Sequence, residues 1–251
     1  MNHALLGPSS SYKWLNCPLS AKLEYETEES PPSKYAGEGT LAHSICEAYA
    51  NKKFKKMATR AFNKAIKEAK SSELYTPEML KHAESYVELL GQIVLNYETM
   101  PYIQLEQKVD ISEYVPESFG TVDCLIIGGE TLTIVDIKYG QGVKVSAEYN
   151  PQLMLYALGV LNRYSPLYGQ NIKQISIYIF QPRLDNTSCF NITTEDLLSW
   201  GENEVKPKAQ KAFMGFGECI PGEWCDKGFC KIRANCKNLV TISTLYSIIK
   251  L

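Results

Sequence analysis

The most constraining feature of the sequence is the stretch FGTVDCLIIGGETLTIVDIKYG, residues 119–140. Two short apolar runs flank a Gly-Gly pair, the pattern of a β-hairpin. Each run contains one aspartate, Asp123 or Asp136. An unpaired carboxylate buried in a strand costs several kcal/mol. The stretch therefore predicts a hairpin whose aspartates lie at solvated strand ends or face a cation.

The register of this hairpin decides whether the two aspartates meet. A two-residue turn on residues 129–130, or a four-residue turn on residues 128–131, places Asp123 directly opposite Asp136. Side chains alternate along a strand, so Lys138 then shares the face of Asp136. A three-residue turn would instead send the aspartates to opposite faces. With an even turn their Cβ atoms are about 5 Å apart.

Two carboxylates at that separation repel each other unless a cation lies between them or one is protonated. Mg²⁺ and Mn²⁺ are usually held by one or two carboxylates together with substrate phosphates. A neighbouring lysine can position or deprotonate an attacking water and offset phosphate charge. The alternative is an edge hairpin with an ordinary Asp–Lys surface pair. The hairpin sequence by itself leaves both interpretations open.

Two further segments carry polar side chains suited to the same site. The segment NPQLMLYA places Gln152 and Tyr156 four residues apart, on one face of an expected helix. They could hold a phosphate or a base near a metal, although buried Gln and Tyr are common. In EGTLAH, His43 follows an expected helix start at Gly-Thr. A lone histidine is more often structural, but an imidazole on a helix can complete a metal shell.

Length and composition indicate one soluble domain over residues 1–251. The chain is 45% hydrophobic and 22% charged, with net charge −2, so any nucleic-acid site must be local. No apolar run is long enough for a signal peptide or a bilayer span, which predicts a cytoplasmic protein. Helical patterns fill residues 40–100, followed by strands and a strand–helix–strand pattern over residues 101–200. This order predicts an α/β core with an N-terminal helical region.

The order of four short motifs points to a known family. G-T-x-x-H (39–43) precedes G-x-x-D (120–123), D-x-K (136–138) and Q-x-x-x-Y (152–156). Each motif is short, but together they resemble the RecB-type branch of the PD-(D/E)XK nuclease superfamily. The resemblance covers most of the chain. It implies a mixed central sheet flanked by helices, with an N-terminal helical insertion and a Cys-rich C-terminal tail.

The resemblance also implies roles for individual residues. The metal ligands would be His43, Asp123, Asp136 and the backbone carbonyl of Ile137. Lys138 would be the catalytic lysine, and Gln152 and Tyr156 would orient DNA. Glu106, in the strand QLEQKVDI, resembles the family's acidic residue on the preceding strand and would support the ligands without binding the metal. The implied metal is Mg²⁺ or Mn²⁺.

Cysteines concentrate near the C-terminus, where residues 219–236 read C-x₅-C-x₄-C-x₅-C. In a reducing compartment these are not expected to form disulfides. A four-cysteine Zn²⁺ site is one hypothesis, although zinc sites usually have a tighter pair. The other is an iron–sulfur cluster. The scattered Cys46, Cys124 and Cys189 are expected to be small core residues.

AddB-like and CRISPR-associated relatives have one cluster cysteine before the histidine motif and three near the C-terminus. This resemblance favours a [4Fe-4S] cluster that staples residues 217–237 to the N-terminal region, held by Cys17, Cys225, Cys230 and Cys236. The chain departs from the family with C-x₄-C where C-x₂-C is usual. Cys219 would be a spare or a substitute ligand.

A local basic segment offers a path for DNA. Residues 51–70 contain eight basic side chains and one acidic one. We expect phosphate contacts from Lys52, Lys53, Lys55, Lys56, Arg60 and Lys64. Phe54 and Phe62 could stack on bases. The alternative is a solvated helix face whose Phe side chains point into the core.

The sequence therefore predicts a metal-dependent DNA nuclease, an exonuclease acting on single-stranded or end-exposed DNA. A resemblance to phage and prophage proteins implies a role in recombination, replication or repair, with recombination or single-strand-binding proteins as partners and with homo-oligomers. One alternative is a non-catalytic DNA-binding protein that keeps the fold, against which the intact Asp123, Asp136 and Lys138 argue. A structure-specific endonuclease is the other. No P-loop motif is present.

Overall fold

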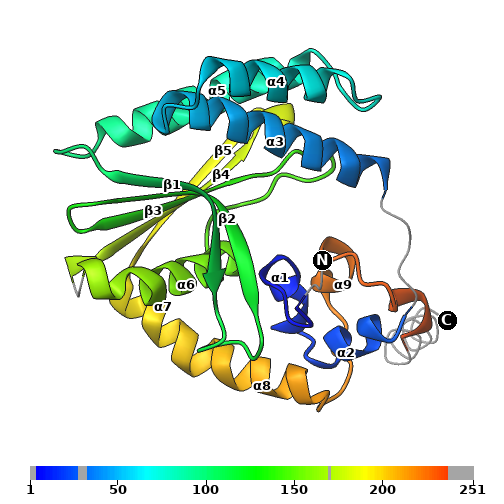
Figure 1. Ribbon diagram of the computed structural model, residues 1–251. Coiled ribbons are helices and arrows are strands. Elements are labelled where there is room, and N and C mark those ends of the chain that lie inside the picture. Colours follow the sequence, from blue (N-terminus) through cyan, green and yellow to red (C-terminus); the bar gives the residue numbers. More distant parts are fainter. Residues whose placement is uncertain (1–3, 28–32, 169–170, 237–251) are drawn as a thin grey trace.

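The computed structural model describes residues 4–27, 33–168 and 171–236. At its centre is a five-stranded sheet in the order β1-β2-β3-β4-β5 (Figure 1). All neighbouring strands are antiparallel except β3 and β4, which are parallel. The strands are β1 (Tyr102–Asp110), β2 (Phe119–Gly128), β3 (Thr131–Ile137), β4 (Gln174–Gln181) and β5 (Asn186–Thr193).

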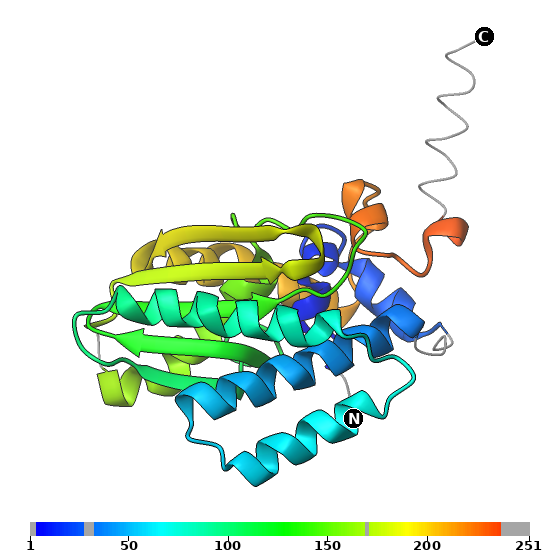
Figure 2. The ribbon, with the colours of Figure 1, turned by 90° about the horizontal axis from the view of Figure 1, so that it is seen from above.

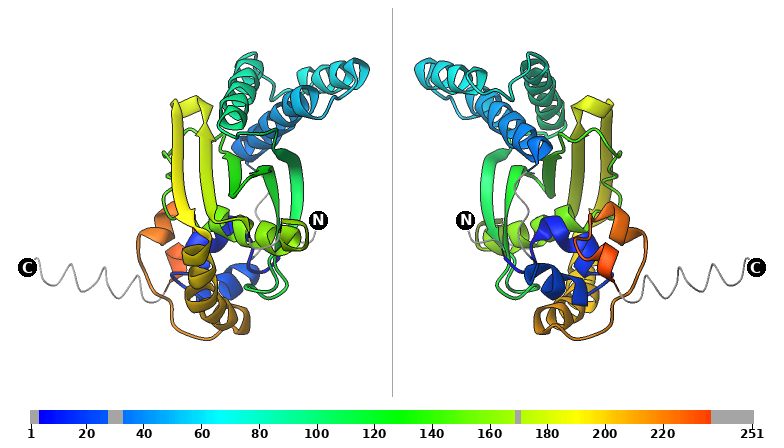
Figure 3. Two further views of the ribbon diagram at one scale, coloured as in Figure 1. Left: turned by 90° about the vertical axis from the view of Figure 1, so that its left-hand side faces the viewer. Right: turned by 90° about the vertical axis from the view of Figure 1, so that its right-hand side faces the viewer.

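Helices cover both faces of the sheet. Helix α6 (Pro151–Tyr168) connects β3 to β4, and with α7 (Thr194–Trp200) and α8 (Lys206–Met214) it lies on one face. The other face is covered by α3 (Lys34–Phe54) and α5 (Glu78–Leu95), and α4 (Thr59–Lys70) packs beside α3, farther from the strands (Figures 2 and 3). Buried apolar side chains form two clusters, one under each helical layer. The predicted mixed α/β core with an N-terminal helical region is confirmed.

The hairpin of β2 and β3 has an even, two-residue turn, one of the turn lengths that the sequence left open. Gly128 pairs with Thr131, so the turn consists of Gly129 and Glu130. Gly129 has φ +54°, a left-handed conformation that suits glycine. The register continues to Cys124 opposite Val135. The next step along both strands places Asp123 opposite Asp136.

The pairing of β1 with β2 is interrupted where Glu106 stands opposite Asp123. Glu106 has φ 46°, which is uncommon for a residue with a side chain. The alternation of side chains changes at the same place. Cys124 packs with the α3–α5 cluster and Val122 with the α6 cluster, although they are only two residues apart. The carboxylates therefore lie where these strands pass from one core to the other.

Three details of the sequence-based prediction were wrong. Helix α3 begins at Lys34, six residues before the predicted start at Thr40, and Ser33 Oγ caps it by accepting a hydrogen bond from Ala36 N at 3.2 Å. The edge strand β5 was missed because its sequence is polar. Cys189, on β5, is exposed and not a core residue, whereas Cys46 and Cys124 are buried as expected.

The N-terminal and C-terminal segments lie side by side (Figure 1). Short helices α1 (Ser11–Trp14) and α2 (Leu19–Tyr25) flank Cys17, and α9 (Glu223–Lys227) lies next to them. Lys13 Nζ is 2.6 Å from Glu24 Oε2, with both side chains largely buried, and Lys13 also donates to Gly228 O at 3.1 Å. Among the described helices, none is long and apolar enough to cross a membrane.

Candidate active site

The candidate site lies at the C-terminal end of β3, between helices α3 and α6. Asp123 and Asp136 come from adjacent strands, and Glu106 lies across from Asp123 on β1. Three carboxylates from three neighbouring strands thus share one row of the sheet. Asp123 and Asp136 are the next residues of their strands beyond the last ladder pair, Cys124 with Val135, and their meeting around a cation stays a prediction.

A chain of polar contacts runs from β3 to α6. Lys138 Nζ lies 2.9 Å from Asp136 Oδ2 and donates to Gln152 Oε1 at 2.8 Å. Gln152 Nε2 donates to Tyr156 OH at 3.1 Å. Asn150 Oδ1 caps α6 by accepting from Leu153 N at 3.3 Å, which fixes the turn that carries Gln152. Lys138, Gln152 and Tyr156 are thereby brought together as predicted.

The glycine of the G-x-x-D motif makes room for this chain. A Cβ atom on Gly120 would lie 2.5 Å from Tyr156 Cε1 and 3.2 Å from Pro8 Cγ. Only glycine therefore lets the Tyr156 ring pack across β2. Burial raises the pKa of Tyr156, and the charge of Asp136 raises it further, so the phenol stays protonated and can donate a hydrogen bond.

Helix α3 brings His43 to the other side of Asp123. His43 Nδ1 lies 3.5 Å from Asp123 Oδ2, and the same oxygen accepts a hydrogen bond from Ile137 N at 2.7 Å. Burial lowers the pKa of His43, but contact with Asp123 and the charge of Asp136 outweigh burial and raise it above its ordinary value. The carbonyl of Ile137 as a ligand stays a prediction.

Asp136 is the most deeply placed carboxylate of the site. Its side chain is 5% exposed. Burial raises the pKa of Asp136, Lys138 lowers it and Asp123 raises it; the balance is an increase. Oδ2 is buried and accepts no hydrogen bond from any described residue, because the contact with Lys138 is an ion pair outside hydrogen-bonding angles. A buried oxygen of this kind is available to a cation.

The donor set suits Mg²⁺ or Mn²⁺, because carboxylate oxygens are the ligands these ions prefer. No three His, Cys, Asp and Glu side chains within the described ranges are already arranged around a metal position. Instead, the Lys138 ammonium group lies against Asp136, and the His43 ring lies against Asp123.

Glu47 was missed from the sequence. It lies one turn after His43 on α3, and its Oε1 accepts from Asn51 Nδ2 at 3.3 Å. Partial burial and the charges of Asp123 and Glu47 raise the pKa of Glu106 to about 7, so Glu47 faces the acidic row. The spacing of four residues from His43 on one helix face could have indicated this placement.

The cysteines of the two chain ends gather around α1, α2 and α9. Cys17, Cys225 and Cys236 are buried, and Cys230 is half-buried. Cys17 Sγ accepts from Ile220 N at 3.3 Å, which brings Cys219 to the same region. Burial raises the pKa of Cys219 to about 12, and the nearby Cys236 and Cys17 raise it as well. Cys219 thus joins the predicted neighbourhood, but no three of these cysteines are arranged around a common metal position in the part of the chain that the structure describes.

The basic segment forms the end of α3, a turn and α4. The alternative interpretation of its aromatic residues is correct: Phe54 packs against the α3–α5 core, and the Phe62 ring stands edge-on to Tyr49 at 5.1 Å. Lys55 Nζ donates to Gln104 Oε1 at 2.8 Å, two residues before Glu106 on β1. Lys52 donates to Met57 O and Thr59 Oγ1 and is half-buried. Of the six predicted phosphate contacts, five are exposed: Lys53, Lys55, Lys56, Arg60 and Lys64.

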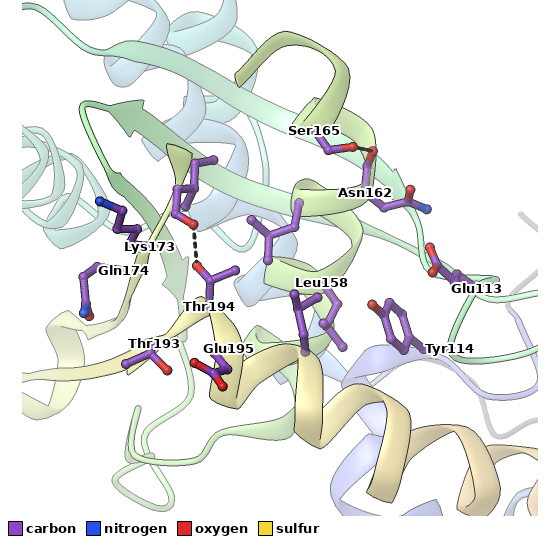
Figure 4. Close-up of a pocket in the computed structure, with 13 residues that line it drawn as sticks. Glu113, Tyr114, Leu158, Asn162, Ser165, Lys173, Gln174, Thr193, Thr194 and Glu195 are labelled. Atoms are coloured by element: carbon purple, nitrogen blue, oxygen red, sulfur yellow. Dashed lines mark hydrogen bonds between the residues drawn. The ribbon is translucent and has the colours of Figure 1, made fainter. Parts of the chain in front are cut away.

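A separate cavity of about 800 Å³ lies between α6, α7 and the start of β4 (Figure 4). Its floor is apolar, with Leu158 and Tyr114, and its rim is polar, with Glu113, Lys173 and Glu195. None of the predicted site residues lines it.

Comparison with known proteins supplies two findings. The solved structure titled "Crystal structure of SSO0001" matches 91% of this chain and 96% of that chain, with 14% sequence identity and a TM-score of 0.34. A TM-score at this level carries no argument about chemistry. The sequence matches the family described as "Protein of unknown function (DUF2800)" over residues 3–244. Because this match spans nearly the whole chain, the protein belongs to the DUF2800 family.

Proposed function

We propose that the protein is a Mg²⁺- or Mn²⁺-dependent DNA nuclease of the RecB-like PD-(D/E)XK type, acting as an exonuclease on single-stranded or end-exposed DNA. One observation carries the proposal: Lys138 lies between the buried Asp136 carboxylate and Gln152, with Asp123 and His43 on the other side of the acidic row. Four separate segments converge on that arrangement.

His43, Asp123 and Asp136 would hold the metal ion, with the backbone carbonyl of Ile137. Bound there, Mg²⁺ or Mn²⁺ would lower the pKa of a water molecule and offset charge on the scissile phosphate. The buried Asp136 Oδ2, which pairs with Lys138 but accepts no hydrogen bond from any described residue, supports the donor set.

The chain's own residues would then bind and orient the phosphodiester. Lys138 is held at two points, so its ammonium group has a fixed place beside the acidic row. A preorganised cation of this kind stabilises charge that develops on the phosphate and orients the attacking water. Gln152 and Tyr156 would donate hydrogen bonds to the DNA backbone or a base. Protonated Tyr156 suits a donor role.

DNA would reach the site along the basic segment. Exposed side chains on the end of α3 and on α4 supply positive charge next to β1, and Lys55 sits two residues from Glu106 along that strand. Phosphate contacts through such residues weaken with salt. Base stacking on Phe54 and Phe62 is not part of the proposal, because both rings are used in packing.

For the cysteines we propose an iron–sulfur cluster, [4Fe-4S], held by Cys17, Cys225, Cys230 and Cys236, with Zn²⁺ as the alternative occupant. Cys219 would be a substitute ligand. The burial of three of the four thiols and the contact between Ile220 N and Cys17 support a site that joins the two chain ends. Its role would be structural.

The experiment uses end-labelled linear and covalently closed circular single-stranded DNA with Mn²⁺. Degradation of the linear form alone, from its ends, is expected for the exonuclease. Cleavage of the circle would indicate the endonuclease alternative. Binding without cleavage under any divalent metal would instead identify a DNA-binding protein. Cleavage of the linear form is required for the proposed role in phage recombination or repair. In that role, phage recombination or single-strand-binding proteins would be partners, and the protein would act as a homo-oligomer.

A further inference from the structure

A second polar cluster lies at the same edge of the sheet, on the face opposite Lys138. Arg183 Nη1 is 2.9 Å from Glu38 Oε2, and these side chains are only 19% and 16% exposed. The Arg183 guanidinium lies over the Tyr139 ring, 5.1 Å from its centre. Tyr139 OH is 3.0 Å from His82 Nδ1. The four residues come from four different segments.

We propose that the ion pair between Arg183 and Glu38 is a positioning device that sets His43 on α3 against Asp123 at the end of the sheet. The inference rests on the proposed function, because His43 is taken as a metal ligand there. Arg183 and Glu38 are positioning residues and touch no substrate.

The connections of this cluster explain how the pair could act on the site. Arg183 follows β4 directly, in the short helix Pro182–Leu184, so it is anchored to the sheet. Glu38 lies on α3, five residues before His43, which is about 7.5 Å along a helix axis. Tyr139 directly follows Lys138, so the ring under Arg183 belongs to the segment after β3 that carries the proposed catalytic lysine.

Burial makes this pair different from the surface pairs of the protein. A half-buried pair loses more when one partner is removed than an exposed pair does, because the remaining charge is left poorly solvated. Lys173 and Glu130 form an exposed pair, 64% and 60% accessible, near the β2–β3 turn at the other end of β3. That pair provides a matched control for loss of one cation.

The test measures Mn²⁺ binding by titration calorimetry, which does not require nuclease activity. We expect Arg183→Met and Glu38→Gln each to weaken Mn²⁺ binding about tenfold or more, the range found when residues that orient ligands are removed. Lys173→Met should stay within about twofold of the parent. The exchanged pair Glu38→Arg with Arg183→Glu should recover part of the loss. Hydrogen–deuterium exchange should rise in residues 36–46 of the two single variants only.

Outcomes separate this inference from the proposed function. Variants are compared only where their circular dichroism spectra match that of the parent. If Arg183→Met fails to fold, Glu38→Gln, which keeps the size of the side chain, still tests the proposal. Parent-like Mn²⁺ binding in a folded Glu38→Gln or Arg183→Met protein would overturn the positioning role while leaving the metal site intact. A parent that binds no Mn²⁺ would overturn the proposed function, and the inference with it.

Discussion

Asp123 Oδ2 accepts a hydrogen bond from the backbone N–H of Ile137 at 2.7 Å. A side chain of β2 thus binds the main chain of β3 just beyond the last ladder pair, Cys124 with Val135. The contact fixes the Asp123 carboxylate and the end of β3 together. Since Asp136 and Lys138 flank Ile137, the same contact holds the proposed catalytic residues in place.

Removal of the Lys138 charge should destabilise the protein more than removal of the whole charge pair. Lys138→Met leaves the buried Asp136 carboxylate without its partner, at a cost of about 3 kcal/mol. The double variant Asp136→Asn with Lys138→Met should recover to within about 1 kcal/mol of the parent, because no buried charge remains. Urea unfolding at pH 8 with a chelator measures both. A double variant no more stable than Lys138→Met would contradict the buried-charge explanation.

The two motif glycines should respond oppositely to alanine. Gly120→Ala places a methyl group against Tyr156 and should cost about 1–3 kcal/mol by overpacking, while displacing the Tyr156 ring. Gly39 lies within α3, and a Cβ atom added there would have no neighbour within 4 Å. Gly39→Ala should therefore stabilise the protein by about 0.5–1 kcal/mol, because alanine loses less backbone freedom than glycine in a helix. Thermal unfolding of the matched pair checks this. Equal effects would show that the contact between Gly120 and Tyr156 is absent.

Glu106 should make stability depend on pH. Its pKa in the folded protein, about 7, lies above the ordinary value of 4.5. The stabilisation is therefore complete below pH 4.5 and is lost as the pH rises through 7. Glu106→Gln should gain stability relative to the parent between pH 5 and pH 8, by no more than about 1 kcal/mol, since the partly buried Glu106 keeps contact with solvent, which screens its charge.

The measurement is urea unfolding of metal-free protein at both pH values, with Glu98→Gln, an exposed carboxylate before β1, as the control. The same difference between Glu106→Gln and the parent at pH 5 and pH 8 would refute the raised pKa.

Replacement of Cys17 or Cys236, two buried cysteines near opposite ends of the chain, should remove the proposed cluster. Anaerobically purified parent is expected to show the broad visible absorption of an iron–sulfur cluster. Cys17→Ser and Cys236→Ser should lose it, whereas Cys189→Ser, on the exposed face of β5, should keep it. A colourless protein with one bound zinc would favour the alternative occupant. Purified protein that contains neither iron nor zinc would refute a metal site that joins the two chain ends.

The sheet around the site was predictable because its signals are local. Two apolar runs in residues 119–137 flank a glycine-containing turn, which predicts a hairpin but leaves its register open. The two-residue turn on Gly129 and Glu130 decides the register. The alternation of side chains along a strand predicts that Lys138 shares the face of Asp136. The spacing of four residues on a helix predicts that Gln152 and Tyr156 lie on one face. These positions were inferred without tertiary information.

The misses have physical causes. Gly37 and Gly39 weaken the helical pattern ahead of Leu41, so the true start of α3 was not evident. Strand β5 has exposed, polar side chains typical of an edge strand and no apolar run. The pairing of Glu38 with Arg183 joins ordinary charged residues 145 positions apart, for which the sequence has no local pattern.

The most direct test of the central claim compares two single-lysine variants. Parent, Lys138→Ala and Lys173→Ala proteins are incubated with end-labelled single-stranded DNA and Mn²⁺, with Asp136→Ala as a second site variant. The nuclease proposal predicts rapid degradation by the parent and Lys173→Ala, and at least about a hundredfold loss in Lys138→Ala and Asp136→Ala. Equal rates in all four proteins, or no cleavage by the parent, would contradict it.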